Sequence, residues 1–510
     1  MVAPSPISLS ASQRSASSFS TQRSSPMDLQ SSFNGTMLTS LTSSMVDDAR
    51  DDDIIPPGPN PRTLILCFDG TGDQFDTDNS NVILLNSLLM KDRPTEQLVY
   101  YQAGIGTYTI PEIATPMWAN FSETMDMMIA WNLDAHVMGG YEFLMNNYQA
   151  GDKICLFGFS RGAYTARAVA GMVHKVGLLP RSNHQQVPFA YHMFSRTDEL
   201  GWKQSTAFKK TFSMDVDIDF IGVWDTVCSV GLIPKRLPFT MSNDSIRVFR
   251  HALSLDEHRA KFKANHYNYP SEDEAKLGIQ PGDMPKSGAR KRTKKKGLTE
   301  LEEEFSQQDG HHGHTDVLEV WFAGCHCDVG GGSVSNEDTQ NLARIPLRWM
   351  IRQCFLTKTG IRFHSDLLHT VGLDPASLFP YVKQRPPAIY SLPSHPREAT
   401  AATLVDASLP GNEEEEDYKD ALRPIYDQLT LARYWWLLEI VPLEHRRQSK
   451  DHKWTNKIYV NLGGGREIPE HQPFYVHRSV KTRLEAHDLE GGPYKPKCAN
   501  FDRMQPIWVD

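Results

Sequence analysis

The chain has 510 residues, with 53 Lys and Arg against 62 Asp and Glu, so its formal net charge is −9. Hydrophobic residues make up 40% and charged residues 23%, which is typical of a globular protein and excludes a collagen or a wholly disordered chain. The negative charge disfavours a nucleic-acid-binding protein, and no apolar stretch approaches the roughly 20 residues that cross a bilayer.

The N-terminal segment is rich in Ser, which provides 15 of the first 45 residues, and it ends in an Asp cluster before Pro56 and Pro57. Because it buries too little apolar surface to offset its ordering entropy, we predict a disordered tail over residues 1–57 and a single domain over 58–510. Its start has no signal-peptide pattern, and the seven scattered cysteines are typical of free thiols in a reducing compartment. We therefore expect a cytoplasmic location, with organelle targeting by the tail left open.

Apolar runs rich in strand-forming residues predict five strands, at 63–68, 98–101, 154–157, 218–224 and 317–323. Apolar residues at helical spacing predict helices at 81–90, 122–148, 162–175, 340–355 and 425–441. Strands that alternate with helices favour an α/β fold, with a mostly parallel sheet and helices on both of its faces.

Two polar insertions interrupt this pattern, at about 268–315 and 395–418. The first contains a basic run, an acidic run and three His residues, and the second ends in the acidic run Glu413 to Asp417. Both are predicted to be solvated loops, with a nuclear-localisation patch, a metal site or a peripheral membrane contact through the first left as alternatives. The helix at 425–441 is hydrophobic nearly all round at Tyr434 to Leu438, so we expect it to pack in a helical cap or C-terminal layer, or to line an apolar substrate pocket.

A nucleophile motif follows the third predicted strand. Residues 158–162 read Gly-Phe-Ser-Arg-Gly, and a helix with many small residues leads out of them. In the G-x-S-x-G turn of an α/β-hydrolase the serine sits on a strained strand-to-helix turn, where Gly158 and Gly162 allow close approach of neighbouring chains. We therefore interpret Ser160 as a catalytic nucleophile, the alternative being a turn with a capping serine.

A serine nucleophile needs a base and an acid that orients the base, and in α/β-hydrolases they follow in the order Ser, Asp or Glu, His. Asp225 directly follows the fourth strand and His326 comes three residues after the fifth, so both emerge at the sheet edge expected for Ser160. We predict that Asp225 holds the imidazole tautomer and that His326 takes the serine proton. Asp328 is an alternative acid.

Other histidines are assigned lesser roles. His251 and His258 are placed in a helical stretch, where we expect them to support the site or the structure, and His477 is a distant alternative.

The oxyanion hole is expected to use the backbone N–H of Arg161 and a second N–H from the loop after the first strand, at Gly70 or Thr71. Asp69 is predicted to brace that loop. The run Cys325-His326-Cys327 lacks a second pair with zinc-ligand spacing, so we expect no metal and no cofactor.

A phosphatase is a weaker alternative. The run from Leu64 to Thr71 is similar to the first motif of haloacid-dehalogenase-type phosphatases, but Cys67 stands where their nucleophilic Asp would be.

Five ordered motifs within about residues 60–355 resemble the family of domain-of-unknown-function α/β-hydrolases that includes the catalytic domain of type VI secretion phospholipase effectors. The motifs are Phe68 to Thr71, Gly158 to Ala163, Val223 to Val227, His251 to Glu257, and Gly324 to Gly332. The resemblance implies an α/β-hydrolase-like fold with a Ser160-Asp225-His326 triad, and in the bacterial effectors the substrates are phospholipid acyl esters. Cys327 departs from the pattern, since the family often has Ser or Ala there.

These observations predict a serine hydrolase that cleaves carboxylic esters through an acyl-enzyme, with a small-molecule ester or a phospholipid or other lipid ester as substrate. The alternative is a non-catalytic binding or scaffold protein on a hydrolase fold. No nucleic-acid partner is expected.

Overall fold

The computed structural model describes residues 53–58, 61–71, 73–104, 118–227, 237–240, 243, 245–268, 284, 315–389, 412–448, 454–470, 472–487, 489 and 491–510. All of them belong to one compact unit, Arg50–Asp510. Most of the predicted tail, nearly all of the 268–315 insertion and residues 395–411 of the second insertion lie outside the described residues.

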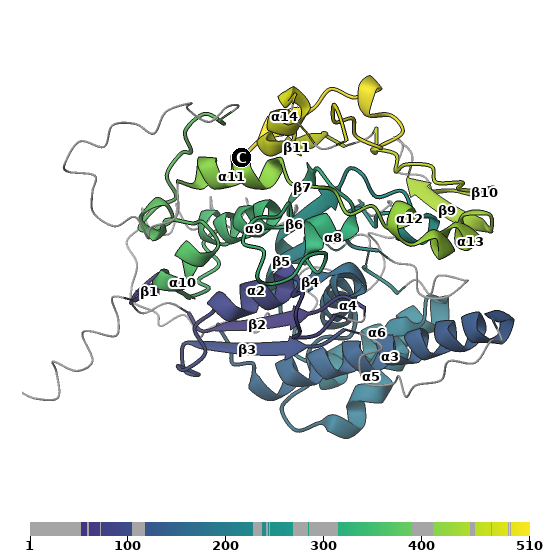
Figure 1. The fold of residues 1–510 in the computed structure, drawn as a ribbon. Coiled ribbons are helices and arrows are strands. Elements are labelled where there is room, and N and C mark those ends of the chain that lie inside the picture. Colours follow the sequence, from purple (N-terminus) through teal and green to yellow (C-terminus); the bar gives the residue numbers. More distant parts are fainter. Residues whose placement is uncertain are drawn as a thin grey trace, which may run out of the picture. The chain divides into compact units, whose positions relative to one another are not determined.

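An eight-stranded sheet runs through this unit in the order β12-β11-β7-β6-β5-β4-β2-β3, and every neighbouring pair in it is parallel (Figure 1). Its strands are β2 (Thr63–Phe68), β3 (Gln97–Gln102), β4 (Lys153–Phe159), β5 (Ile218–Trp224), β6 (Ile246–Ser254), β7 (Asp316–Phe322), β11 (Tyr475–His477) and β12 (Ile507–Val509). The five predicted strands are β2, β3, β4, β5 and β7.

Helices cover both faces of the sheet. On one face lie α3 (Trp118–Asn147), α4 (Ser160–Val176), α5 (Val187–Ser195) and α6 (Glu199–Phe212), and on the other lie α2 (Asn81–Leu88) and α9 (Arg344–Leu356). Along β2, Leu64 and Leu66 pack into the first layer, whereas Ile65 and Cys67 pack into the second. A strand buried on both faces reads as a continuous apolar run. The predicted α/β-hydrolase-like fold class is confirmed.

The stretch around His251 differs from the prediction, because residues 246–254 form the central strand β6 and not a helix. Two polar side chains, Arg250 and His251, are buried in this strand and satisfied by partners on other elements. They break up the apolar run that would have identified the strand.

Smaller elements complete the unit. They are β1 (Ile54–Ile55), η1 (His184–Gln186), η2 (Ala260–Phe262), α8 (His326–Gly330), β8 (Phe363–His364), α10 (Ser365–Thr370), η4 (Pro375–Ser377), α11 (Glu413–Ala421), α12 (Gln428–Leu431), η5 (Arg433–Trp435), α13 (Trp436–Glu439), β9 (Pro442–Gln448), β10 (Trp454–Val460), α14 (Arg478–Glu485) and η6 (Phe501–Arg503). Among the described helices, none has both the length and the apolar character needed to cross a membrane.

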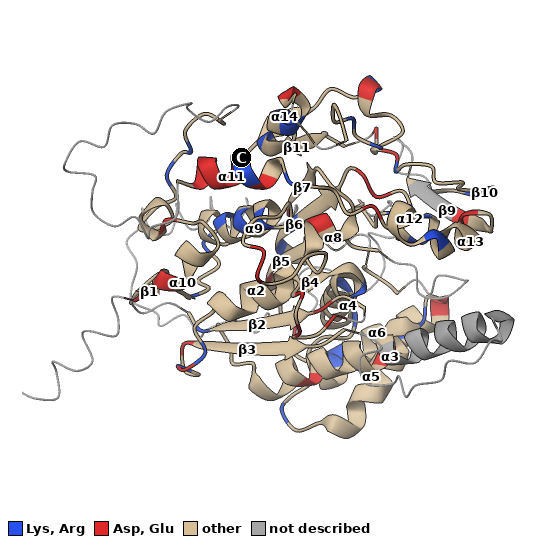
Figure 2. Ribbon diagram, in the orientation of Figure 1, with Lys and Arg blue, Asp and Glu red and all other residues tan. Residues whose placement is uncertain are grey.

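The acidic run predicted to end a polar loop instead opens helix α11 and is buried. Asp417 lies 2.6 Å from Arg348 and 2.8 Å from Arg385, and Glu413 lies 2.6 Å from Arg352. Figure 2 shows the acidic α11 beside the basic α9. The loop prediction was wrong here because these ion pairs join residues far apart in the chain.

The helix predicted at 425–441 is also broken, into α12, η5 and α13. Tyr434, Trp436 and Leu437 are exposed and not packed in a layer. Glu439 interrupts the apolar run, and burial of its carboxylate against three donors sets the direction of the last turn.

Candidate active site

Ser160 lies at the junction between β4 and α4, on a strained turn. Its φ of 59° is in the left-handed region, which is unusual for a residue other than glycine. A Cβ atom on Gly158 would lie 2.6 Å from the Gly162 carbonyl oxygen, and one on Gly162 would lie 2.3 Å from the carbonyl oxygens of Phe68 and Asp69. Both glycines of the motif are therefore required by close backbone approach, and the end of β2 lies directly beside the turn.

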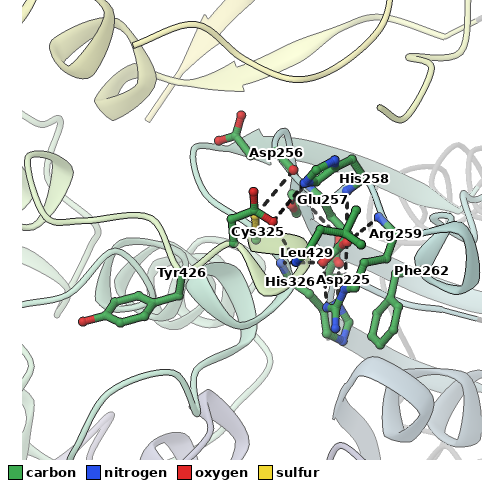
Figure 3. A network of polar contacts seen from close by, with 12 residues as sticks. Asp225, Asp256, Glu257, His258, Arg259, Phe262, Cys325, His326, Tyr426 and Leu429 are labelled. Carbon is green, nitrogen blue, oxygen red and sulfur yellow. Dashed lines mark hydrogen bonds and ion pairs between the residues drawn. The ribbon is translucent and has the colours of Figure 1, made fainter. Parts of the chain in front are cut away.

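His326 connects Ser160 to Asp225. Its Nε2 lies 2.8 Å from Ser160 Oγ, and its Nδ1 lies 2.5 Å from Asp225 Oδ2. All three residues are at most 5% exposed, and they come from the C-terminal ends of β4, β5 and β7. The carboxylate can only accept, so Nδ1 donates to it and Nε2 accepts from the serine hydroxyl. The structure thus brings the three sequence-predicted residues together (Figure 3 draws Asp225 and His326).

The electrostatics of this group favour a neutral histidine beside an ionised aspartate. Burial lowers the pKa of His326 below its ordinary value, although the hydrogen bond and charge of Asp225 act in the opposite direction. Burial alone would raise the pKa of Asp225, but Arg466 and the hydrogen bond from His326 hold it well below its usual range. The imidazole is therefore free to accept a proton at neutral pH.

Arg466 is a functional residue that the sequence reasoning missed. Its guanidinium is 2% exposed and contacts both carboxylate oxygens of Asp225, at 2.5 and 2.8 Å, while it also donates to the Phe262 carbonyl. The sequence around Arg466 gives little indication that it lies at the site, since Arg466 follows three glycines in a segment with no other motif typical of a catalytic site. Only the tertiary structure places it beside Asp225.

Glu319 was also missed, and it gives His251 a supporting role. The Thr226 N–H donates to His251 Nε2 at 3.0 Å, so His251 Nδ1 carries the proton and donates to Glu319 Oε1 at 2.7 Å. The buried pair of His251 on β6 and Glu319 on β7 therefore holds the backbone of Thr226 in place. Thr226 directly follows Asp225, which has a φ of 40°.

The chain around His326 is fixed by two further acids, which Figure 3 shows close to it. Glu257 Oε2 accepts from the His326 N–H at 3.3 Å and pairs with Arg259, and Asp256 accepts from the Gly324 N–H at 2.6 Å. Both acids stand in the motif at residues 251–257, which is the signal that could have identified them.

Asp328, the alternative acid, has a different place. Its carboxylate caps α8, accepting from the Cys325 N–H at 2.8 Å and from the Tyr426 N–H at 3.0 Å, while burial raises its pKa to about 7. It therefore braces the turn that carries His326, whose ring is oriented by Asp225.

The loop after β2, where the oxyanion hole is expected, lies beside the elbow, and the Asp69 carboxylate bonds within it and to its neighbours. The carboxylate accepts from the Gly70 N–H at 2.9 Å, from Ser80 at 2.6 Å and from Tyr101 at 2.7 Å. Because this bond occupies the Gly70 N–H, Thr71 is the better of the two predicted donors, and its buried hydroxyl has no hydrogen-bond partner within the described structure. Arg161 is the second residue of α4, so its backbone N–H lies in the first turn of the helix, directly after Ser160.

The two other histidines considered from the sequence, His258 and His477, form hydrogen bonds away from Ser160. His258 lies between the Gly463 carbonyl and Asp427, at 3.0 and 2.9 Å, and His477 bonds Ser479 at the start of α14.

The cysteines next to His326 do not gather around a common centre. Cys325 Sγ donates to the Asp256 carbonyl, and within the described part of the chain no cluster of His, Cys, Asp and Glu is arranged to hold a metal ion. Cys67, the position relevant to a phosphatase, is buried in β2, and burial raises its pKa to about 12.

The parallel sheet, the elbow and the order of the three residues define an α/β-hydrolase-like protein. More particularly, the chain belongs to the family of catalytic domains of T6SS phospholipase effectors of the Tle1-like type, whose model matches residues 62–353.

Three individual proteins that are similar to this chain are described next by their identity and coverage. An uncharacterized protein of Saccharomyces cerevisiae, YEL023C, is 29% identical over 542 residues, which cover 83% of this chain and 79% of that protein. A crystal structure of an uncharacterized Pseudomonas aeruginosa protein matches 66% of this chain and 50% of its own, with 17% identity and a TM-score of 0.32. A Tle1 effector bound to the VgrG spike of the type 6 secretion system matches 54% of this chain and 52% of its own, with 16% identity and a TM-score of 0.25. The chain thus spans about half the length of each solved structure.

Proposed function

We propose that this protein is a serine hydrolase that cleaves carboxylic esters of lipids through an acyl-enzyme on Ser160. The observation that carries the proposal is the hydrogen-bonded series Ser160–His326–Asp225 at the C-terminal edge of the sheet. Lipid esters are favoured as substrates because the chain belongs to a family of phospholipase-effector catalytic domains.

In the first half-reaction, Ser160 Oγ attacks the ester carbonyl carbon while His326 Nε2 accepts the hydroxyl proton. The carbonyl oxygen becomes an oxyanion, which the N–H of Arg161 and a donor on Thr71 would stabilise together with the N-terminus of α4. The intermediate then collapses, the bond to the alcohol oxygen breaks, and His326 gives its proton to the leaving alcohol.

In the second half-reaction, His326 takes a proton from water, and the resulting hydroxide equivalent attacks the acyl carbon. Collapse releases the carboxylic acid, and the proton on His326 returns to Ser160 Oγ. Asp225 stays ionised throughout and stabilises the imidazolium that forms twice in each cycle.

The test is the variant Ser160→Ala. We expect the wild type to react with a fluorophosphonate probe and to hydrolyse p-nitrophenyl butyrate and the acyl esters of phosphatidylcholine, and the variant to lose labelling and at least about 10³-fold of each rate. Ser87→Ala is a matched control, because Ser87 is an exposed serine on α2. Undiminished turnover by Ser160→Ala would reject the mechanism, and a wild type inert to probe and esters would favour the scaffold alternative.

A further inference from the structure

Exposed apolar side chains are concentrated in one stretch of the molecule. Half of the large apolar side chains that are exposed in the described structure fall between residues 431 and 462, including Leu437 at 60% and Ile458 at 73% exposure. A folded protein seldom leaves so many together without a partner. The members of this apolar patch are Leu431, Tyr434, Trp436, Leu437, Ile440, Ile458, Tyr459, Val460 and Leu462.

The two halves of the apolar patch are held together by a buried acid. Glu439, at the end of α13, is 1% exposed and accepts from Asn461 Nδ2 at 2.6 Å and from the Gly463 N–H at 2.9 Å. The Trp436 ring packs against Gly463, where a Cβ atom would lie 3.1 Å from it. The α13 turn and the end of β10 therefore form one preformed surface.

This surface adjoins the candidate active site. Glu439 also accepts from the Ala260 N–H at 2.6 Å, which ties α13 to the short helix η2. The last residue of η2, Phe262, lies with its ring centroid 4.9 Å from that of His326 and 5.5 Å from that of Trp435 (Figure 3 shows Phe262 and His326). Trp435 directly precedes Trp436, so the rings of Trp435 and Phe262 connect the apolar patch to the base.

The charge of this region is opposite to that of the whole chain. Residues 428–463 contain six Lys or Arg against three Asp or Glu, in a chain whose net charge is −9. Among the described side chains, Glu439 is buried, whereas Arg433 and Lys457 are exposed next to apolar-patch residues, as is the acid Glu444 (Figure 2 shows the charges near α13).

We propose that the apolar patch is the surface by which this protein docks on an anionic phospholipid bilayer. Trp and Tyr beside Leu and Ile, flanked by basic residues, are the composition of surfaces that insert into the headgroup region of a membrane. The basic surplus favours an anionic bilayer over a second copy of this acidic chain. The proposal rests on the proposed function, because docking here would present lipid esters beside Phe262 and His326.

The experiment uses the full chain with Ser160→Ala, so that vesicles are not consumed. We expect it to co-sediment with phosphatidylcholine vesicles containing about 30 mol% phosphatidylserine and to bind pure phosphatidylcholine far more weakly. Adding Leu437→Ser, Ile440→Ser and Ile458→Ser should lower binding at least about tenfold. Adding Arg433→Gln and Lys457→Gln instead should lower it about fivefold for each charge removed.

A matched control triple is Phe189→Ser, Leu200→Ser and Leu356→Ser, whose side chains are 60%, 54% and 52% exposed outside the apolar patch. It should bind vesicles like its parent. Equal binding by the two triples, no binding by the parent, or binding indifferent to phosphatidylserine would each overturn the proposal. So would a dimer of the parent that the apolar-patch triple dissociates, since the occupant would then be a second copy.

The docking proposal and the proposed function fail in different ways. With Ser160 intact, the apolar-patch triple should hydrolyse the water-soluble p-nitrophenyl butyrate at the wild-type rate and lose activity only on vesicles. If no variant hydrolyses either ester, the proposed function fails, while the co-sedimentation result still decides the docking surface.

Discussion

Asp225 illustrates how far single residues are constrained at this site. Its carboxylate accepts four hydrogen bonds, from the Ser254 N–H, from two nitrogens of Arg466 and from His326 Nδ1. Its backbone is held in the left-handed region. A buried carboxylate with so many donors remains ionised and immobile, so the imidazole that it orients has one tautomer and one direction.

The first prediction at this scale concerns pH. Only neutral His326 can accept the serine proton, and burial lowers its pKa below the usual value of about 6.5. Ester hydrolysis should therefore rise with pH along a single acid limb centred below 6.5 and be well past its midpoint at pH 7. The pH dependence of kcat/KM on p-nitrophenyl butyrate measures this limb, and a midpoint at or above 7 would contradict the assignment.

The second residue-scale prediction concerns Arg466, which acts through Asp225. Without the guanidinium, burial would act against a weaker opposing charge and the pKa of Asp225 would rise, so less of the acid would be ionised as the pH falls. We expect Arg466→Met to lower kcat at least about tenfold, more at pH 5.5 than at pH 8, with little change in KM for a soluble ester.

Arg466→Lys should recover part of kcat, because an ammonium restores the charge without the two-pronged contact. A purely structural role for Arg466 predicts a loss that does not depend on pH and no recovery by Lys. Thermal unfolding of both variants, followed by circular dichroism, separates lost folding from lost catalysis.

At the scale of elements, α9 and α11 are joined by charge as well as by apolar packing. Arg348 on α9 is 1% exposed and lies 2.6 Å from Asp417 and 2.7 Å from Asp420, both on α11. Removal of one partner from a buried pair leaves an uncompensated charge.

We therefore expect Arg348→Met to lower the free energy of unfolding by about 3–5 kcal/mol, measured by urea denaturation. Arg247→Met is the control, because Arg247 pairs with Asp219 at 2.8 Å but its side chain is 42% exposed, and such pairs contribute about 0–1 kcal/mol. Similar losses for the two variants would mean that the α9–α11 pairs are no stronger than surface ones.

The strands and helices also show which elements can be predicted from the sequence and which cannot. Strands β2, β4 and β5 were predictable because both of their faces are mainly apolar and glycines or turn residues bound them. Strand β6 was hidden by Arg250 and His251, and α11 by acids whose arginine partners lie at 348, 352 and 385. Polar groups satisfied by distant partners are invisible to a local pattern.

At the scale of the whole molecule, some residues of the candidate site could be predicted from the local sequence, whereas others could not. Ser160, Asp225 and His326 could be placed from sequence because each stands at or shortly after the end of a strand of one parallel sheet, whose ends meet at one edge. Arg466 and the apolar patch could not, because they lie after the segment that carries the family's motifs. The C-terminal residues are thus part of the site and not an appendage to it.

This division leads to a prediction for truncated chains. A chain that ends at residue 411 keeps all of the matched segment 62–353 but loses Arg466, the acids of α11, and β11, which pairs with β7 at the sheet edge. Arg348 and Arg352 would then be left in an apolar layer without their acidic partners, and Asp225 without its guanidinium. We expect this chain to be largely insoluble, and its soluble fraction to be unreactive with the fluorophosphonate probe.

Deletion of residues 1–49 is the natural control, because every described residue of the site lies within the unit Arg50–Asp510. That deletion should leave probe labelling and the urea midpoint as in the full chain. A soluble, probe-reactive chain ending at residue 411 would show that the matched segment is sufficient alone, and that Arg466 and β11 adjust a site which forms without them.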